Sequence, residues 1–481
     1  MLPLCPVASE ATARTLFRAR RRHTAVAGSP LDPPRPEYDA LIPTPDLAAL
    51  DGTATLRSAR VPSPFLDRVP DGAAVDRDGA ALVDVVLVGG RIAAVRAAAG
   101  DAPAPGEVDL RGRHLWPTLV DVHTHLDKGH IVDRAPNGPG DFRGAIDATR
   151  ADREANWRRP DLDRRMGFGL RCAEAHGVAA IRTHLDSYEG QAPDSWAAFR
   201  ALRDAYAGRV ALQAVALVAL DVYRTPFGAD LADLVAASGG LMGGVTRATA
   251  GLHEEELSDL TDLLDRLFRL ARERGLDVDL HVDESGDPTA AALPAVARAA
   301  IRHGYEGRVT CGHCCSLALQ DEPTFREQAA LLRDAGIAVV SLPTVNMYLQ
   351  DRAPGRTPRW RGVAPLEELR AAGVRVAVAG DNCRDPFHAY GDGDMLDTWR
   401  QAVRIAHLDH PFGEAAALCG PAPAAIMGLP HAGRIAVGGS ADLIVLEAWS
   451  MDQVMARPQG DRTVIRGGRR IDAKAPSYAE L

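Results

Sequence analysis

A repeated pattern of helix, glycine and strand constrains the fold more than any other feature of this sequence. Apolar residues at helical spacing run into a glycine, which is followed at once by a short stretch rich in β-branched residues. Glycine is favoured just past a helix end because it accepts positive φ angles. Six segments show the pattern: AEAHGVAAIRTHLD, RDAYAGRVALQAVAL, LARERGLDVDLHVDE, RHGYEGRVTCGHCC, LRDAGIAVVSLPTVN and RAAGVRVAVAGDN. The middle of the chain therefore alternates helices with strands.

Two further segments bring the number of predicted strands to eight. TLVDVHTH precedes the six segments, and GGLMGGV lies between the second and the third. Eight strands alternating with helices close a (β/α)8 barrel, so the predicted fold class is α/β with a TIM-like barrel. An open doubly wound sheet is the alternative, although it would not need eight similar units. The sequence has no GxGxxG after a strand and no GxxxxGK[ST], so dinucleotide and P-loop sites lack support.

Small β-rich pieces flank this middle on both sides. ATLRSARV, ALVDVVLVGGRIAAVRA and EVDLRGRHLWP precede it, and AGRIAVGGSADLIVLEA and RTVIRGGRRI follow it. The predicted boundaries are β-rich parts in residues 53–112 and 433–481, with the barrel in residues 113–432. Residues 1–52, which are rich in proline from residue 31 onward, are predicted to be a poorly ordered extension or linker.

Composition and charge exclude several classes of protein. The net charge of -9 gives no nucleic-acid footprint, and no stretch approaches the roughly 20 apolar residues of a membrane span. The first 30 residues contain no continuous apolar segment of the kind found in secretory signals. Seven scattered cysteines do not form a disulfide framework, which favours a reducing, cytoplasmic location. We expect a small-molecule partner and no nucleic-acid or membrane partner, and leave open a homo-oligomer.

Residues that bind metals gather where the predicted strands end. Strand one ends in His123 and His125, and positions i and i+2 of a strand point to the same side. The fifth strand ends in His281, and later strands end in His313 and Asp381. The active site of a barrel lies at the C-terminal ends of its strands. Imidazoles together with one carboxylate suit a divalent first-row ion such as Zn or Fe.

The CGHCC stretch offers a competing zinc site. Cys311 and Cys314 have the spacing of one ligand pair, but a structural zinc site normally needs a second pair at matched spacing. We find no second pair. Cys311, Cys314 and Cys315 are therefore predicted to be buried thiols at a strand end.

Five motifs in order along the chain carry a resemblance to a known family. They are HTHLD, HVDE, GH, VN-x-x-LQ and GDN-x-RDP. Together they resemble the amidohydrolase superfamily, most closely its cytosine deaminase branch. HTHLDK and GDN-x-RD are also similar to N-isopropylammelide amidohydrolase. GRIAVGGSADLIVL looks like the returning strand of that family's small β-sandwich, which is built from both chain ends. The resemblance covers about residues 53–472.

The resemblance implies a single Zn or Fe ion and a set of roles. The metal ligands would be His123, His125, His281 and Asp381. Glu284 would shuttle protons, and His313 would hydrogen-bond the metal-bound water. A bound cation lowers the pKa of water from about 16 to about 7, giving hydroxide at neutral pH. The hydroxide would attack a ring carbon that bears an amino group, Asp381 or His313 would accept its proton, and ammonia would leave.

The residues implied to bind the substrate depart in part from the cytosine deaminase pattern. Ala219 stands where that branch has a glutamine that reads the amide edge of the pyrimidine, and Asn382 replaces an acidic residue. Asn346 and Gln350 of VN-x-x-LQ complete the implied set. An asparagine both donates and accepts, so it suits a different ring edge. The sequence therefore predicts a deaminase of an amino-substituted heterocycle, which is cytosine-like or another pyrimidine, triazine or imidazolone.

Two other functions are weighed against deamination. Hydrolysis of a cyclic amide or of an N-alkylamino triazine is one, but cyclic amidases of the superfamily usually bridge two metals with a carboxylated lysine. The only lysines here, Lys128 and Lys474, do not lie on a mid-barrel strand, so Lys128 is predicted to line the rim or form an ion pair. A non-catalytic scaffold is the other alternative, because a fold does not fix a function.

Overall fold

The computed structural model describes residues 45–481 except residues 248, 250–258 and 410–411. Residues 1–45 and 46–481 form two separate units, and the first lies almost entirely outside the described residues. Most of the predicted extension therefore also lies outside them. At its described end, Leu47 and Leu50 are buried in the hydrophobic core.

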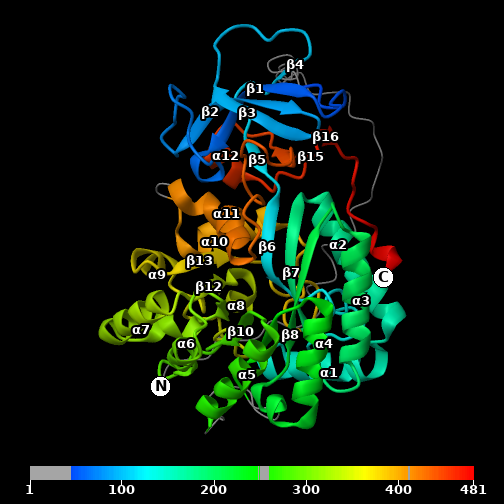
Figure 1. Ribbon diagram of the computed structural model, residues 1–481, viewed down its shortest axis with the longest axis vertical. Coiled ribbons are helices and arrows are strands. Elements are labelled where there is room, and N and C mark those ends of the chain that lie inside the picture. The colour runs from blue at the N-terminus through cyan, green and yellow to red at the C-terminus, as the bar shows by residue number, and fades with distance from the viewer. Residues whose placement is uncertain (1–44, 248, 250–258, 410–411) are drawn as a thin grey trace, which may run out of the picture. The chain divides into compact units, whose positions relative to one another are not determined.

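Eight parallel strands form the centre of the second unit (Figure 1). One sheet holds three strands in the order β6-β7-β8, and another holds five in the order β13-β12-β11-β10-β9. The strands are β6 (Leu119–Thr124), β7 (Val178–Asp186), β8 (Ala211–Leu217), β9 (Met242–Val245), β10 (Val278–Val282), β11 (Val309–His313), β12 (Ala338–Ser341) and β13 (Arg375–Val378). All eight fall in the segments predicted from the sequence.

Isolated bridges join the two parallel sheets at both edges. Val215 with Leu241 and Ala219 with Val245 connect the β8 and β9 regions, and Thr124 with Asp381 connects β6 to the residues after β13. Each of these bridges is parallel. The arrangement is consistent with a TIM barrel, and the α/β prediction is confirmed at that level.

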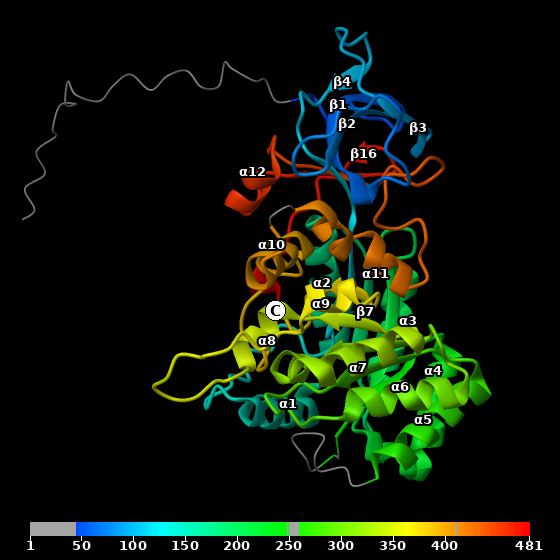
Figure 2. The same ribbon diagram turned by 90° about the vertical axis from the view of Figure 1, so that its left-hand side faces the viewer.

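Helices follow the strands in the predicted alternation. They are α1 (Phe142–Asn156), α2 (Arg159–Ala175), α3 (Ala192–Ala205), α4 (Pro226–Ser238), α5 (Leu260–Arg274), α6 (Ala292–His303), α7 (Glu322–Asp334), α8 (Pro343–Leu349), α9 (Leu366–Ala371), α10 (Met395–Ala406), α11 (Pro421–Ile426) and α12 (Met451–Ala456). Helices α5, α6 and α7 lie side by side outside the strands (Figure 2). Among the described residues, none of the helices combines the length and apolar character that a bilayer crossing requires.

Helix α5 shows why these segments become helices against a sheet. Leu263, Leu264, Leu267 and Phe268 are fully buried on one face, while charged residues occupy the other. Gly275 ends the helix in the left-handed conformation at φ 69°, and its N–H donates to carbonyls of the last turn. The chain then turns into β10, whose five residues are all buried. The order of helix, glycine and strand in the sequence thus sets where β10 begins. It thereby also sets the position of His281 near the end of that strand.

Two small sheets lie outside the eight parallel strands, and the second contains residues from both sides of the barrel sequence. The first, ordered β3-β2-β1-β4, is mixed and holds β1 (Ala54–Pro62), β2 (Ala80–Val88), β3 (Arg91–Ala97) and β4 (Glu107–Asp109). The second, ordered β16-β15-β14-β5, is antiparallel and holds β5 (Leu115–Pro117), β14 (Leu443–Val445), β15 (Thr463–Arg466) and β16 (Arg469–Arg470). Trp116 pairs with Ile444, so strands from both ends of the sequence do share a sheet.

Candidate metal centre

Four side chains from the C-terminal ends of three strands converge on one point. His123 lies on β6 and His125 directly after it, His281 lies on β10, and Asp381 follows β13. The Nε2 atom of His281 lies 3.2 Å from Nε2 of His123 and 3.2 Å from Nε2 of His125. Oδ1 of Asp381 lies 3.0 Å from Nε2 of His125 and 3.6 Å from Nε2 of His123. We call these four residues the histidine–aspartate cluster; they are the four predicted ligands.

The chemistry of this cluster fits a divalent ion. Four ligands about 2.1 Å from a tetrahedral ion lie about 3.4 Å from one another, close to the separations found here. All four side chains are buried, and burial with the neighbouring imidazoles holds the pKa values of His123 and His281 well below their usual range. The rings are therefore neutral and offer lone pairs. Within the described residues, the three Nδ1 atoms and both Asp381 oxygens have no hydrogen-bond partner.

The backbone around the cluster is shaped to bring the ligands together. The N–H of Asp381 donates to the carbonyl of His123 at 2.8 Å, which ties two ligand-bearing segments directly. Asp381 adopts a positive φ of 60°, which non-glycine residues seldom adopt. Gly312 on β11 packs against the ring of His123, because a Cβ at this position would lie 2.8 Å from Cε1. The glycine of the GH motif thus makes room for a ligand on another strand.

Glu284 and His313 stand beside the cluster and share a partner. Nδ2 of Asn346 donates to Nδ1 of His313 at 2.9 Å and to Oε1 of Glu284 at 3.2 Å. Nε2 of Gln350 donates to the backbone carbonyl of Glu284 at 3.2 Å. Burial lowers the pKa of His313 to about 4, so its ring is neutral at pH 7. Nδ1 of His313 also lies 3.2 Å from Oε1 of Glu284, and Nε2 is a buried atom with no partner in the described part of the chain.

A cavity of about 1020 Å³ opens over the cluster. Its wall includes six of the predicted residues, namely His125, His281, Glu284, His313, Asp381 and Asn382. Asn346, Gln350 and Ala219 are not part of the wall. The first two lie behind it and hold Glu284 and His313, while Ala219 is buried between Leu217 and Asp221, which do face the cavity.

A charged cluster that the sequence analysis anticipated only in part lies in the same cavity wall. Nζ of Lys128 lies 3.0 Å from Oδ1 of Asp186, and the other Asp186 oxygen accepts from Arg153 at 2.7 Å. Oδ2 of Asp127 accepts the backbone N–H of Asp186 at 2.7 Å. We call these four residues the lysine–aspartate cluster. The predicted ion pair of Lys128 is thus present, and Lys128 also lies 5.4 Å from the ring centroid of Phe387.

The sequence analysis missed His184 on β7. Its ring packs 3.9 Å from the ring of His123, centroid to centroid, and it is fully buried. Together with Asp279 these two histidines form a second group of possible ligands, but Arg182 donates to Asp279 at 2.8 Å and places a cation there. The polar stretch RTHLD at the end of a predicted strand is the sequence feature that could have indicated His184.

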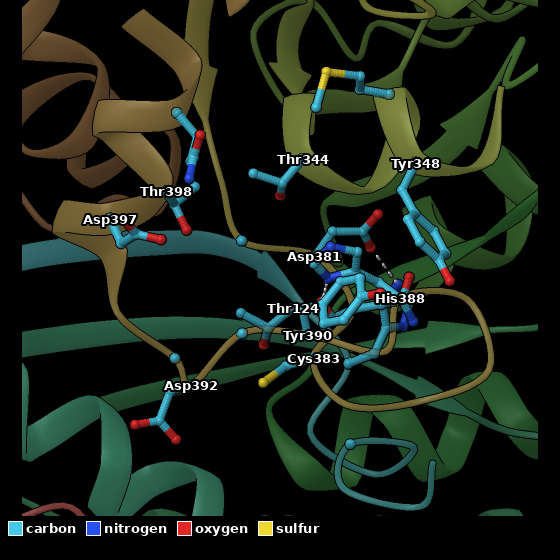
Figure 3. Close-up of a pocket in the computed structure, with 18 of the residues that line it drawn as sticks. Thr124, Thr344, Tyr348, Asp381, Cys383, His388, Tyr390, Asp392, Asp397 and Thr398 are labelled. Atoms are coloured by element: carbon cyan, nitrogen blue, oxygen red, sulfur yellow. Dashed lines mark hydrogen bonds and ion pairs between the residues drawn. The ribbon is translucent and has the colours of Figure 1, made fainter. Parts of the chain in front are cut away.

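A second cavity, of about 1030 Å³, lies on the other side of Asp381. It shares only His125, Asp381 and Asn382 with the first, and Glu284, His281 and His313 are absent from its wall. Figure 3 shows Asp381 between Thr398 and Asp397 on one side and Tyr348 and His388 on the other. The candidate for substrate is therefore the first cavity, where the acid–base residues lie.

The cysteines of CGHCC do not take part in a metal group. Cys311, Cys314 and Cys315 are buried thiols that form no disulfide, as expected from the sequence. Of the groups of possible ligands found among residues 45–247 and the described residues beyond, neither includes a cysteine.

Comparison with known proteins gives consistent matches. The model of the Amidohydrolase family matches residues 159–472. Pterin deaminase of Rhizobium rhizogenes (strain K84) is 50% identical over 406 residues, which is 84% of this chain and 91% of that protein. N-isopropylammelide isopropyl amidohydrolase of Pseudomonas sp. (strain ADP) is 26% identical, over 81% of this chain and 93% of that protein. The structure of 5-methylcytosine deaminase from Klebsiella pneumoniae with phosphonocytosine matches with a TM-score of 0.73 and 25% identity, over 87% of this chain and 98% of that one.

Proposed function

The chain belongs to the amidohydrolase family, and on that premise we propose that it is a metal-dependent deaminase of an amino-substituted heterocycle of the pterin type. The observation that carries the proposal is the histidine–aspartate cluster with Glu284 beside it in one cavity. The substrate class comes from the 50% identity to a pterin deaminase, and it replaces the cytosine-like ring expected from the sequence.

One Zn or Fe ion would be held by His123, His125, His281 and Asp381. Neutral imidazoles and a single carboxylate are ligands of the borderline type that these ions prefer. When bound, the ion would supply a water activated for attack at neutral pH. No lysine stands among the four ligands to bridge a second ion, because Lys128 is paired with Asp186. We therefore propose a single-ion site.

Glu284 is proposed to move the protons of the reaction. Deamination joins the oxygen of water to the ring carbon and breaks the bond to the amino group, so one water proton ends on the ring nitrogen and the other on the departing ammonia. Glu284 lies at the cavity wall beside His281 and is held from behind by Asn346 and Gln350. A carboxyl group fixed in this way can carry protons between the two positions. His313, through its buried Nε2, would orient the attacking oxygen, and Asp381 would accept its first proton.

Asn382 is the residue proposed to read the ring edge. Its Nδ2 donates to Oδ2 of Asp385 at 2.7 Å, which fixes the amide plane at the cavity wall. Ala219 leaves no side-chain amide at the position where cytosine deaminases have glutamine. A cavity of about 1020 Å³ is also at the upper end of the range typical of small-molecule sites, which suits a bicyclic ring better than a single pyrimidine.

Hydrolysis of an N-alkylamino triazine is the second candidate. It is favoured by the relative from Pseudomonas that acts on N-isopropylammelide, of which this chain covers 93%. The same residues would serve, with an alkylamine leaving in place of ammonia. At the level of the fold, we propose that the parallel strands between residues 113 and 432 close into one barrel, and that residues 53–112 and 433–481 form a β-sandwich together with β5 (Leu115–Pro117).

A screen of leaving groups tests the proposal. The purified protein, with its bound metal measured, is incubated with pterin (2-amino-4-oxopteridine), cytosine, isocytosine, creatinine, an aminotriazine and N-isopropylammelide. We expect ammonia from pterin in equal amounts with the 2,4-dioxo product, at the highest kcat/KM of the set. Faster release of isopropylamine would favour the second candidate. Metal-loaded protein that releases no amine from any compound would contradict both.

A further inference from the structure

The loop after β13 carries Asn382, the residue proposed to read the ring edge of the substrate. Asn382 and Phe387 both lie in the wall of the substrate cavity. Asp385 connects them, because its Oδ2 accepts from Asn382 at 2.7 Å and its Oδ1 accepts the backbone N–H of Phe387 at 2.8 Å. The position of this loop, residues 381–394, therefore decides where the ring edge is read.

Tyr478, nearly a hundred residues further along the chain, contacts this loop at two points. Its hydroxyl donates to Oδ1 of Asp392 at 2.9 Å. The guanidinium of Arg384 lies over its ring, 4.4 Å from the centroid. The ring also stacks on Phe168 of α2, with centroids 5.6 Å apart and an interplanar angle of 29°. One tyrosine thus joins the loop to a helix of the barrel.

Asp392 is held from both sides by charged and polar groups. Besides the hydroxyl of Tyr478, its Oδ2 bonds to Nε2 of His176, directly after α2, at 2.9 Å. Partial burial alone would raise the pKa of Asp392. These two hydrogen bonds instead hold that pKa below its ordinary value, so Asp392 is a carboxylate at neutral pH. Asp392 also faces the second cavity (Figure 3). This end of the loop is therefore fixed by the hydrogen bonds of Asp392 to both Tyr478 and His176.

Arg384 stands in a backbone conformation that needs support. Its φ is 52°, in the left-handed region that L-residues seldom adopt. The side chain is held by Asp133 at 2.6 Å and by the ring of Tyr478, and its backbone carbonyl accepts the N–H of Val132 at 3.0 Å. Arg384 is two residues from Asn382. A change in how Arg384 is held will therefore move the amide that reads the ring.

Tyr478 itself sits in a locally ordered turn. Ser477 caps the short 3-10 helix Tyr478–Glu480 in a capping box with Glu480. The carboxylate of Glu480 lies 2.7 Å from the guanidinium of Arg171 on α2. The C-terminal residues accordingly lie against α2 in Figure 1. The turn presents the Tyr478 ring to the loop in a fixed orientation.

We propose that Tyr478 is a positioning residue for the substrate, acting through Arg384 and Asp392 on Asn382 and Phe387. The metal ligand Asp381 is held independently by its backbone bond to His123. Loss of Tyr478 contacts should therefore weaken substrate binding and leave metal binding and the chemical step in place. The prediction for turnover rests on the proposed function, whereas the prediction for loop order does not.

Three variants of the metal-loaded full chain test this. Tyr478→Phe removes the hydroxyl and keeps the ring, and Tyr478→Leu removes both. Tyr206→Phe is the matched control, because that hydroxyl also donates to α2, at the Gly167 carbonyl (3.4 Å), away from the loop. We measure metal content, melting temperature, kcat and KM for pterin, and hydrogen exchange of the peptide that covers residues 383–394.

The expected result is a rise in KM without a change in kcat. One lost hydrogen bond corresponds to about a 3- to 10-fold rise in KM for Tyr478→Phe, and Tyr478→Leu should exceed it. Exchange of residues 383–394 should quicken in the same order, with metal content unchanged and Tyr206→Phe like wild type in each measurement. Unchanged KM and exchange in Tyr478→Leu would overturn the proposal, as would a joint fall of kcat, metal content and melting temperature. If wild type deaminates no heterocycle, the proposed function fails, and the exchange data still decide whether Tyr478 orders the loop.

Discussion

Two polar clusters lie in the wall of the same cavity, and they are built in opposite ways. The lysine–aspartate cluster is complete in itself, because both oxygens of Asp186 meet a cation and Asp127 accepts its backbone N–H. The histidine–aspartate cluster directs three imidazole nitrogens and a carboxylate oxygen at one another within 4.8 Å, and four of these separations are 3.0 to 3.6 Å. In the lysine–aspartate cluster each oxygen of Asp186 has a cationic partner, whereas the histidine–aspartate cluster is complementary to a cation.

We therefore expect the lysine–aspartate cluster to stabilise the site and the histidine–aspartate cluster to bind the metal. Neutral buried imidazoles facing one another are unfavourable unless a shared cation lies between them. A buried ion pair with matched charges needs no ligand, and its removal is felt as lost stability. Changes in the histidine–aspartate cluster should therefore abolish metal binding with small effects on the apo fold. Changes in the lysine–aspartate cluster should leave the metal bound and weaken the fold.

The largest effect is expected from His281→Asn. The substitution removes one of three imidazole donors from the centre of the cluster, so we expect metal content to fall and turnover to drop by more than about 10⁴-fold, beyond what one proton-transfer residue contributes. Metal analysis after dialysis and the ammonia assay measure this. Exposed His431→Asn is the matched control and should behave as wild type. Full metal content in His281→Asn would remove this residue from the ligand set.

Glu284→Gln should separate metal binding from proton transfer. The amide keeps the size of the carboxyl group but cannot shuttle a proton, so we expect stoichiometric metal and a fall in kcat of about 10²- to 10⁴-fold. Steady-state kinetics with metal analysis of the same sample provide the test. Glu306→Gln, an exposed position before the start of β11, serves as control. Near-normal kcat in Glu284→Gln would show that another group carries the protons.

The sequence predicts the histidine–aspartate cluster better than the cavity around it. Side-chain alternation along a strand places His123 and His125 on one side, and parallel strands bring His281 and Asp381 to the same rim, so local periodicity is enough. The partners of Asn346 and Gln350 depend on how helix α8 packs after β12. The spacing of apolar residues in the sequence does not determine this packing. These two residues therefore support Glu284 from behind, although the motif suggested substrate contact. The path of the loop over residues 381–394 depends on Tyr478, a contact distant in sequence.

His184 illustrates the same limit within a strand. Its position on β7 was predicted, but its importance rests on packing 3.9 Å from the ring of His123, a contact between neighbouring strands. The alternation of side chains along a strand predicts the face on which a residue lies, but not which side chain of the neighbouring strand its ring contacts. β6 and the second half of β7 are buried along their whole length. Polar and apolar side chains there are therefore equally buried, and only their contact partners distinguish them.

The smallest effect is expected from Lys128→Met, and it concerns stability. Burial alone would raise the pKa of Asp186, but the neighbouring cations Lys128 and Arg153 hold this pKa well below its ordinary value. Because Arg153 remains, we expect a loss of about 3 kcal/mol in the free energy of unfolding at pH 7, near the lower end of the range for a broken buried pair. Metal content should stay at the wild-type level. Urea unfolding of both proteins measures the difference, and Lys474→Met, the exposed second lysine, is the control.

The pH dependence of this difference tests its cause. A carboxyl group with a depressed pKa adds stability that is present above its unfolded pKa of about 4 and is lost as the pH falls toward the folded value. The part of the Lys128→Met deficit that comes from Asp186 should therefore persist from pH 7 to 5 and shrink below pH 4, as Asp186 takes up its proton. Burial raises the pKa values of Asp127 and Asp385 to about 7 and Lys128 lowers them, so these two groups add a part of the deficit that shrinks as the pH falls through 7. A deficit that does not change with pH would assign the loss to packing of the lysine stem. Loss of metal together with stability would show that the two clusters do not act separately, and the distinction between them would then fail.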